Sequence, residues 1–296
     1  MATEQIDPRY VDLDAWPTSE IIAAIYDGQV AAAGAVRGAL ESIKAAVEDA
    51  VPALQRGGRL VYAGAGTSGR IGVQDGSELP PTFDWPSDRL VFAMAGGLEA
   101  LTRSSEGAED NERAGAQAML DAKVAPNDVV MGVAASGTTP FTIGALRAAS
   151  AAGAVTIAIA NNAGAPIFEV ARHHILAETG SEVIAGSTRM KAGTAQKIIL
   201  NLISTTIMVK MGRVYRGLMV DMRARNAKLR RRAQAIVSQI AGCSESDAAG
   251  YLEKTGGELK PAVLVALGLE PNEAARLLDR CGRNLRAAIA SMRGDG

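Results

Sequence analysis

The chain has 296 residues, 48% of them hydrophobic, and a formal net charge of -1 from 31 basic and 32 acidic side chains. This balance gives no electrostatic footprint for nucleic acid or for an anionic membrane, so an anionic ligand must be bound by local groups. Two cysteines, no signal-peptide pattern and no apolar run of membrane-spanning length predict a reducing, cytoplasmic location without a membrane partner.

Apolar residues recur at helical spacing from about residue 18 to residue 54, which predicts two helices ahead of the first strand. Residues 1–55 are therefore expected to form an N-terminal helical segment packed on the core. Short β-rich runs follow, separated by helical stretches, at residues 60–63, 90–95, 129–134, 155–160 and 174–177. Each run is continuously apolar, as expected of parallel strands covered on both faces. The pattern predicts an α/β fold with a doubly wound, mostly parallel sheet.

The last part of the chain is predicted to be helical. A basic run from Arg223 through Lys228 to Arg232 lies in a helical pattern without aromatic residues, which favours a solvated or subunit-contacting face. Beyond it, glycine-containing breaks separate three predicted helical segments at residues 245–254, 258–266 and 272–290. We expect a sheet domain with long C-terminal helices over residues 56–240 and a small helical bundle over residues 241–296.

The first strand runs into a turn rich in glycine, threonine and serine over residues 64–70. Such a turn presents backbone N–H groups and hydroxyls to an anion. The same residues spell the G-x-G-x-x-G dinucleotide fingerprint, which also needs an acidic residue closing the second strand. That strand ends in Gly96-Gly97, and Asp84 and Asp88 precede it. The sequence therefore favours phosphate over a dinucleotide.

Two further segments also offer hydroxyls or a helix N-terminus to an anion. A hydroxyl-rich turn follows the third strand, and Ser187 or Thr188 is expected to cap a long helix whose N-terminus carries partial positive charge. Ligands of such sheets bind beyond the carboxyl ends of the strands, so these segments are expected to face one crevice. The predicted phosphate- and substrate-binding residues are Gly66, Thr67, Ser68, Gly69, Ser136, Gly137, Thr138, Ser187, Thr188 and Lys191.

Two glutamates follow the predicted ligand turns, Glu78 and Glu109. Two carboxylates in one cleft divide acid and base work when their environments separate their pKa values. The alternative for each is a solvated helix residue, and for Glu109 also a carboxylate that stabilises the dipole of the following helix. The adjacent His173 and His174 point to opposite faces of a strand and are interpreted as structural rather than as metal ligands.

The sequence closely resembles the N-acetylmuramic acid 6-phosphate etherases, which carry a sugar-isomerase (SIS) domain. The resemblance spans nearly the whole chain, and the motifs that carry it are residues 3–5, 7–9, 64–70, 77–82, 106–110, 134–137, 186–197 and 218–221. It implies cleavage of the lactyl ether at C3 of N-acetylmuramic acid 6-phosphate, in cell-wall amino-sugar catabolism or recycling, with no metal or organic cofactor. By motif position, Glu109 is the base that removes the C2 proton and Glu78 is the acid that protonates the departing oxygen.

The resemblance also implies a homodimer with sites at the subunit interface, and a C-terminal bundle similar to a ubiquitin-associated (UBA) three-helix module. Family members commonly have arginine, cysteine and alanine where this chain has Thr138, Leu79 and Gly76. The first change removes a fixed cation from a predicted ligand turn.

Two other functions use the same architecture: a sugar-phosphate isomerase, and a non-catalytic sugar-phosphate sensor resembling the glucokinase regulatory proteins. Retention of both glutamates argues against the sensor. A DNA-binding regulator would need a helix-turn-helix module and a basic face, and the sequence indicates neither.

Overall fold

The computed structural model describes residues 1–103, 105, 107–222 and 227–294. Glu106 of one family motif and Arg223 of the basic run lie outside these residues. The chain forms two compact units, one of Met1–Gly76 with Asp88–Thr206 and one of Ser77–Ser87 with Ile207–Gly296. Within the described residues, no helix combines the length and the apolar character needed to span a membrane.

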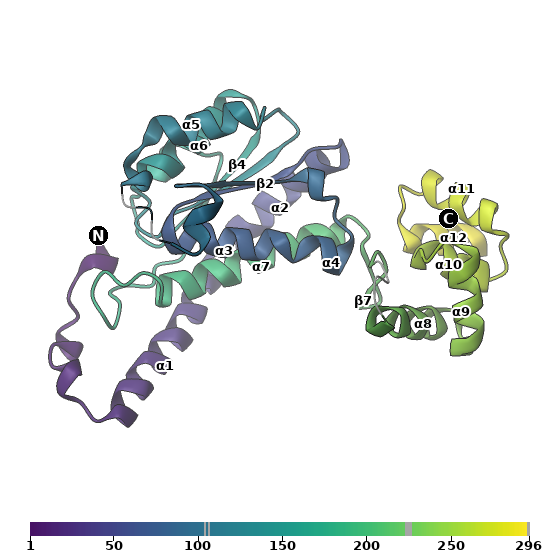
Figure 1. Ribbon diagram of the computed structural model, residues 1–296, viewed down its shortest axis with the longest axis horizontal. Helices are drawn as coiled ribbons and strands as arrows, with labels where there is room; N and C mark the ends of the chain where they lie inside the picture. Colours follow the sequence, from purple (N-terminus) through teal and green to yellow (C-terminus); the bar gives the residue numbers. More distant parts are fainter. Residues whose placement is uncertain (104, 106, 223–226, 295–296) are drawn as a thin grey trace. The chain divides into compact units, whose positions relative to one another are not determined.

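The first unit begins with the predicted helices. Helices α1 (Thr18–Ala35) and α2 (Leu40–Gln55) are joined by the 3-10 helix η4 (Val36–Ala39). Shorter 3-10 helices precede them, η1 (Ala2–Glu4), η2 (Pro8–Tyr10) and η3 (Leu13–Ala15). Helix α2 buries an apolar face of Ile43, Val47 and Leu54, whereas α1 buries only Gly28 and Ala32. Helix α2 is therefore a core helix, and α1 is largely uncovered in the single chain (Figure 1).

A five-stranded parallel sheet forms the centre of this unit, in the order β2-β1-β3-β4-β5. The strands are β1 (Leu60–Gly64), β2 (Leu90–Met94), β3 (Val129–Val133), β4 (Val155–Ala160) and β5 (His173–Leu176). Every residue of β1, β3 and β4 is buried, which explains why their sequences are continuously apolar. The predicted α/β fold with a parallel sheet is confirmed.

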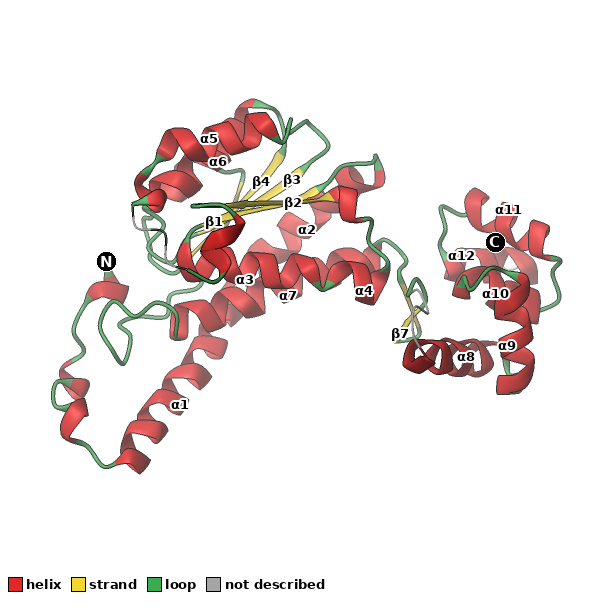
Figure 2. Cartoon of the chain, in the orientation of Figure 1, coloured by secondary structure: helices red, strands yellow, loops and turns green. Residues whose placement is uncertain are grey.

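Helices cover both faces of this sheet (Figure 2). Helices α5 (Glu112–Asp121) and α6 (Pro140–Ala151) lie on one face, and α2 lies on the other together with α3 (Gly66–Ser77) and α7 (Lys191–Lys210). A Cβ added at Gly115 would lie 1.9 Å from the Phe141 oxygen, so α5 and α6 meet without a side chain between them. The remaining 3-10 helices are η5 (Ser87–Arg89), η6 (Leu98–Leu101), η7 (Ala108–Asp110) and η8 (Pro166–Val170).

The two histidines have separate partners. Nε2 of His173 lies 2.8 Å from a carboxylate oxygen of Asp49, and Nε2 of His174 lies 2.9 Å from the carbonyl oxygen of Ala171. The described residues contain no cluster of three or more His, Cys, Asp and Glu side chains suited to a metal ion.

The second unit contains the short helix α4 (Leu79–Phe83) and a two-stranded hairpin of β6 (Val214–Tyr215) and β7 (Leu218–Met219). Helices follow, α8 (Ala227–Ala241), α9 (Glu245–Lys254), α10 (Leu259–Ala266), α11 (Pro271–Arg280) and α12 (Leu285–Arg293). The segment predicted as one helix over residues 272–290 is two helices. Gly282 and Arg283 have φ angles of 59° and 55°, which end α11, and Asn284 caps α12 by accepting from the Ala287 amide at 3.1 Å.

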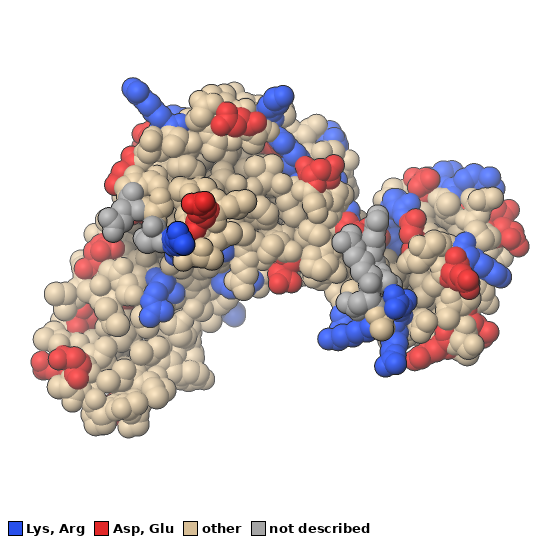
Figure 3. Space-filling view, viewed as in Figure 1, with Lys and Arg blue, Asp and Glu red and all other residues tan. Residues whose placement is uncertain are grey.

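Helix α8 separates its charged face from its apolar face. Lys228, Arg230, Arg231 and Arg232 are exposed, whereas Ile236 and Val237 are buried (Figure 3). The basic side chains of residues 228–232 therefore lie on an exposed face of α8 in the single chain, as the amphipathic pattern predicts.

Candidate functional site

The turn after β1 leaves backbone donors uncommitted at the start of α3. Gly66 has a φ of 50°, and the first bond of the helix runs from the Gly69 amide to the Ala65 oxygen at 3.0 Å. The amides of Gly66, Thr67 and Ser68 precede this bond and have no acceptor within the helix. Free amides at a helix N-terminus are a common arrangement for binding an anion, and the hydroxyls of Thr67 and Ser68 belong to the same turn.

Gly69 lets α3 lie close to β1. Its amide donates to the Ala65 oxygen, and a Cβ at this position would lie 2.8 Å from the Gly64 oxygen. The absence of a side chain therefore helps to set the position of the amides of Gly66, Thr67 and Ser68.

The turn between β3 and α6 is held by its own side chains. Oγ of Ser136 accepts from the amide of Thr138 at 3.2 Å and from its hydroxyl at 3.0 Å. Gly137 has a φ of 70°, and a Cβ there would lie 2.3 Å from Cβ of Ala165. Its amide donates to the Ala134 oxygen at 3.0 Å. Thr138 is exposed, and no arginine is present at this position to add a cation.

The start of α7 is capped differently from the prediction. The amides of Lys191 and Ala192 donate to the two carboxylate oxygens of Glu182, each at 2.9 Å, and Glu182 is fully buried. Glu182 is therefore the cap, in place of the predicted Ser187 or Thr188. A carboxylate on these amides already stabilises the positive end of the helix dipole.

Lys191 is directed into the protein. Its Nζ donates to the Thr179 oxygen at 2.7 Å, and the side chain is buried. The start of α7 nevertheless lies beside the first turn, because a Cβ at Gly193 would be 3.5 Å from Cγ2 of Thr67. Tertiary packing thus brings the α3 and α7 N-termini together.

Glu109 lies in η7, near the carboxyl ends of the first two strands. Its neighbour Ala108 packs against a cluster of Ala65, Ala95 and Phe141, which follow β1, follow β2 and begin α6. The Glu109 side chain is exposed. The structure therefore places η7 at the same edge of the sheet as the β1–α3 turn.

Arg70 holds η6, which precedes Glu109 in the chain, against α3. Its Nε donates to the carbonyl oxygens of Ala100 at 3.1 Å and Leu101 at 3.2 Å, both in η6. Arg70 belongs to a motif in the sequence, but its role could not be predicted, because the acceptors lie in η6, about thirty residues away.

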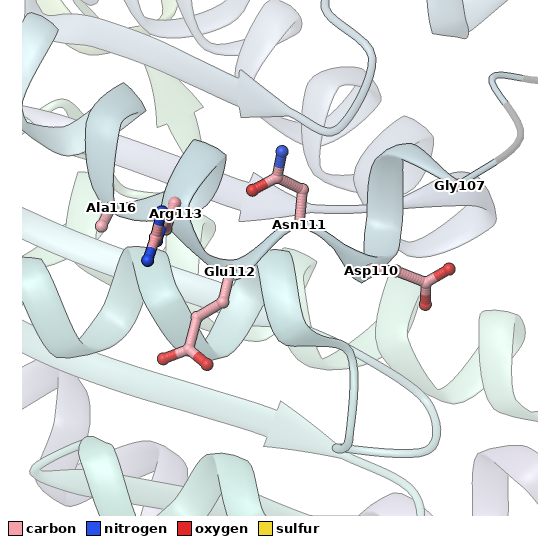
Figure 4. Close-up of a pocket in the computed structure, with 6 residues that line it drawn as sticks. All are labelled: Gly107, Asp110, Asn111, Glu112, Arg113 and Ala116. Atoms are coloured by element: carbon pink, nitrogen blue, oxygen red, sulfur yellow. The ribbon is translucent and has the colours of Figure 1, made fainter.

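A shallow hollow of about 600 Å³ lies next to Glu109 in the chain (Figure 4). Asp110, Asn111 and Glu112 point in different directions along its rim. Asn111 caps α5 by accepting from the Ala114 amide at 2.9 Å, and Glu112 pairs with Arg147. These side chains do not converge on one point.

Thr3 anchors the N-terminal segment at the same edge. Its hydroxyl accepts from the Asn162 side chain at 3.0 Å, its amide donates back to that side chain at 3.3 Å, and it is fully buried. Asn162 also donates to the Ala135 oxygen at 2.9 Å, next to the Ser136 turn. The sequence marks Thr3 as a family motif residue, but it does not reveal this contact.

Asp75 is a buried carboxylate that the sequence analysis did not single out. It accepts from the Tyr62 hydroxyl at 2.9 Å, from Nδ2 of Asn201 at 2.6 Å and from Oγ of Ser204 at 3.2 Å. Burial raises the pKa of Tyr62 well above its ordinary value, and the Asp75 charge raises it further. These bonds tie α3 to both β1 and α7.

Glu78 belongs to the second unit. It follows α3 directly and immediately precedes α4, and its side chain is exposed. Its carbonyl oxygen accepts from the Thr82 amide at 3.2 Å.

We predict that Gly76→Ala destabilises the protein by about 1 to 3 kcal/mol. An added Cβ would lie 2.6 Å from Phe92 and 2.8 Å from Tyr62, and the bond from Tyr62 to Asp75 prevents that ring from moving aside. Urea unfolding measures the change. Gly72→Ala on the same helix is the control, because its Cβ would meet Tyr62 at 3.4 Å, an ordinary contact. Equal effects of the two substitutions would contradict the prediction.

A parallel sheet with helices on both faces and a helix start with free amides at its carboxyl edge is the architecture of a doubly wound α/β domain, the class to which SIS domains belong. Residues 101–205 match the SIS domain family, and residues 42–150 match the glucokinase regulatory protein N-terminal SIS domain. Full-length relatives are more specific. The chain is 49% identical to the N-acetylmuramic acid 6-phosphate etherase of Deinococcus radiodurans over 97% of this chain and 94% of that protein.

Etherases of the same name from Rhizobium rhizogenes and Mesorhizobium japonicum are 45% and 44% identical to it, each over 98% of this chain and 95% of the relative. The chain therefore belongs to the N-acetylmuramic acid 6-phosphate etherase family.

Proposed function

We propose that this protein cleaves the D-lactyl ether of N-acetylmuramic acid 6-phosphate, giving N-acetylglucosamine 6-phosphate and D-lactate. The observation that carries the proposal is the 49% identity to an etherase over nearly the full length of both chains. The free amides at the start of α3 and the presence of η7 with Glu109 at the same sheet edge support the proposal, because the reaction needs a phosphate site and a carboxylate.

The proposed reaction is an elimination followed by addition of water. In the open-chain aldehyde, the C2 proton is adjacent to a carbonyl group, and the Glu109 carboxylate removes it. The C3–O bond breaks, and Glu78 gives its proton to the departing lactate oxygen. Water then adds to C3 of the unsaturated aldehyde, with Glu78 accepting its proton and Glu109 returning one to C2. The two groups thereby recover their starting protonation states.

The phosphate is proposed to bind at the Gly66, Thr67 and Ser68 amides, where the helix dipole favours an anion. The hydroxyls of Thr67, Ser68, Ser136 and Thr138 are proposed to supply further donors. Ser187 and Thr188 lie just before α7, whose start is beside Thr67. Because Lys191 donates to the Thr179 oxygen, we propose that it holds this region in place rather than contacting phosphate directly.

The test is lactate release from N-acetylmuramic acid 6-phosphate in H₂¹⁸O. Release of D-lactate with ¹⁸O at C3 of the sugar would support elimination and hydration. Tight binding of the sugar phosphate without lactate would contradict the etherase proposal and favour a sensor. Interconversion of an aldose and a ketose phosphate would favour an isomerase.

We further propose that the protein is a homodimer, as the family resemblance implies, and that α1 contributes to its interface. Ile22, Tyr26 and Val30 recur at four-residue spacing on one face of α1 and are 62%, 65% and 55% exposed. Such a stripe of large apolar side chains marks an association surface. Helix α1 is joined to α7 through the bond from Thr194 to Gln29, so a partner there would lie near the start of α7.

We expect Tyr26→Glu with Val30→Glu to convert a dimer into monomers, because burying two carboxylates in an apolar interface costs several kcal/mol, about the range known for unpaired buried charges. Light scattering coupled to gel filtration measures the mass. Leu120→Glu is the control, because Leu120 is 65% exposed on α5, a different helix. A dimer that persists in the double variant would exclude this face from the interface.

A further inference from the structure

The segment that carries Glu78 is held in place by Arg213, which directly precedes β6. Nη1 of Arg213 donates to the carbonyl oxygens of Phe83 at 2.6 Å and Asp84 at 3.1 Å. Its guanidinium also lies over the Trp85 ring, with Cζ 5.1 Å from the ring centroid. All of these residues belong to the second unit.

These contacts stabilise a helix that is too short to be stable alone. Helix α4 has five residues, and its last turn is followed by Asp84 with a φ of 49°. A helix of this length depends on tertiary contacts, and its final carbonyl groups need donors from elsewhere. The planar guanidinium donates to two of these carbonyls while it stacks on Trp85, an arrangement that a lysine ammonium does not reproduce.

Arg213 also lies near a charge pair whose lysine is buried. Its Nη1 lies 3.8 Å from Oδ2 of Asp221, and Nζ of Lys260 lies 2.6 Å from the same oxygen. Lys260 is 2% exposed, and it also donates to the Arg283 oxygen at 2.7 Å. Buried charges tolerate only geometries that keep them paired. Helix α10 and the connection between α11 and α12 thus fix the orientation of Arg213.

We propose that Arg213 is a positioning residue for Glu78, and that the C-terminal helices support turnover through the Asp221–Lys260 pair. This inference rests on the proposed etherase reaction. Glu78 is the residue immediately before α4, so a shift of α4 displaces its carboxylate. A general acid acts only within hydrogen-bond reach, and a displacement of about 1 Å costs on the order of 100-fold in rate.

The test compares Arg213→Lys with Arg216→Lys in the full-length protein. Arg216 is a nearby exposed arginine that lies over the Tyr215 ring. Two rates are measured: lactate release, which needs Glu78, and exchange of the C2 proton of N-acetylglucosamine 6-phosphate in D₂O, which needs Glu109. Arg213→Met is a second variant, because methionine keeps aliphatic packing near Trp85 but lacks the donors.

We expect both Arg213 variants to lower kcat for lactate release by on the order of 100-fold, with KM and C2 exchange changed by less than about 3-fold. Arg216→Lys is expected to leave both rates unchanged. An equal fall in lactate release and C2 exchange, no fall in either, or loss of the folded state in both Arg213 variants would overturn the proposal. If the native protein releases no lactate, the proposed function fails instead.

Discussion

Replacing Glu109 by glutamine is expected to abolish both C2 exchange and lactate release, whereas Glu78→Gln is expected to abolish lactate release and retain C2 exchange. Glutamine keeps the size of each side chain but neither accepts nor donates the required proton. Each positioned acid or base contributes about 10² to 10⁴-fold in rate, so lactate release should fall by this factor in both variants. Binding of the sugar phosphate should change little.

The measurements are coupled lactate detection and NMR of the C2 proton in D₂O. Glu112→Gln is the matched control, because Glu112 is an exposed glutamate close to Glu109 that pairs with Arg147. Continued C2 exchange in Glu109→Gln would assign the base to another residue. Full lactate release in Glu78→Gln would remove this glutamate from the role of acid.

Asp75→Ala is expected to produce the largest loss of stability, at least about 3 kcal/mol, because three donors lose their acceptor and a buried donor left unpaired costs about 1 to 3 kcal/mol. The donors are Tyr62, Asn201 and Ser204, and the Tyr62 hydroxyl and Ser204 are buried within the protein. Because α3 begins at the amides proposed to bind phosphate, weaker sugar-phosphate binding should accompany the loss.

Urea unfolding and a binding titration measure these two effects. The control is Tyr62→Phe, which removes one donor and leaves the other two bonds to Asp75, so it is expected to cost roughly 1 kcal/mol. An Asp75→Ala protein as stable as Tyr62→Phe would show that the network adds little to the free energy of unfolding.

Whether a feature could be predicted depends on whether the interactions that form it are local in the sequence. Strands β1, β3 and β4 are apparent in the sequence because each is buried along its whole length, so nearly every residue carries the signal. The break between α11 and α12 escaped prediction, because the apolar spacing continues through Gly282 and Arg283 while the backbone turns left-handed there.

The site shows the same division. The sequence offers the β1–α3 turn and Glu109 as candidates, because glycine and hydroxyl residues at the end of a strand have a local chemical meaning and parallel strands end at one edge. The cap of α7 is not predictable, because Glu182 precedes the helix by nine residues and reaches it through the fold of the intervening loop. Ser187 and Thr188 are nearer in sequence, which made them the natural local candidates.

The sequence by itself determined the parallel α/β sheet and the family, and it predicted a phosphate-binding first turn and two candidate carboxylates. Each of these is encoded by consecutive residues or by long motifs. The tertiary structure decided which residues hold these elements in place. Asp75 accepts a hydrogen bond from Asn201, which is 126 residues away, and Arg213 donates to Phe83 at the end of α4, which is 130 residues earlier in the chain. Such pairs depend on how packed elements meet, and neither partner carries a local pattern that specifies the other.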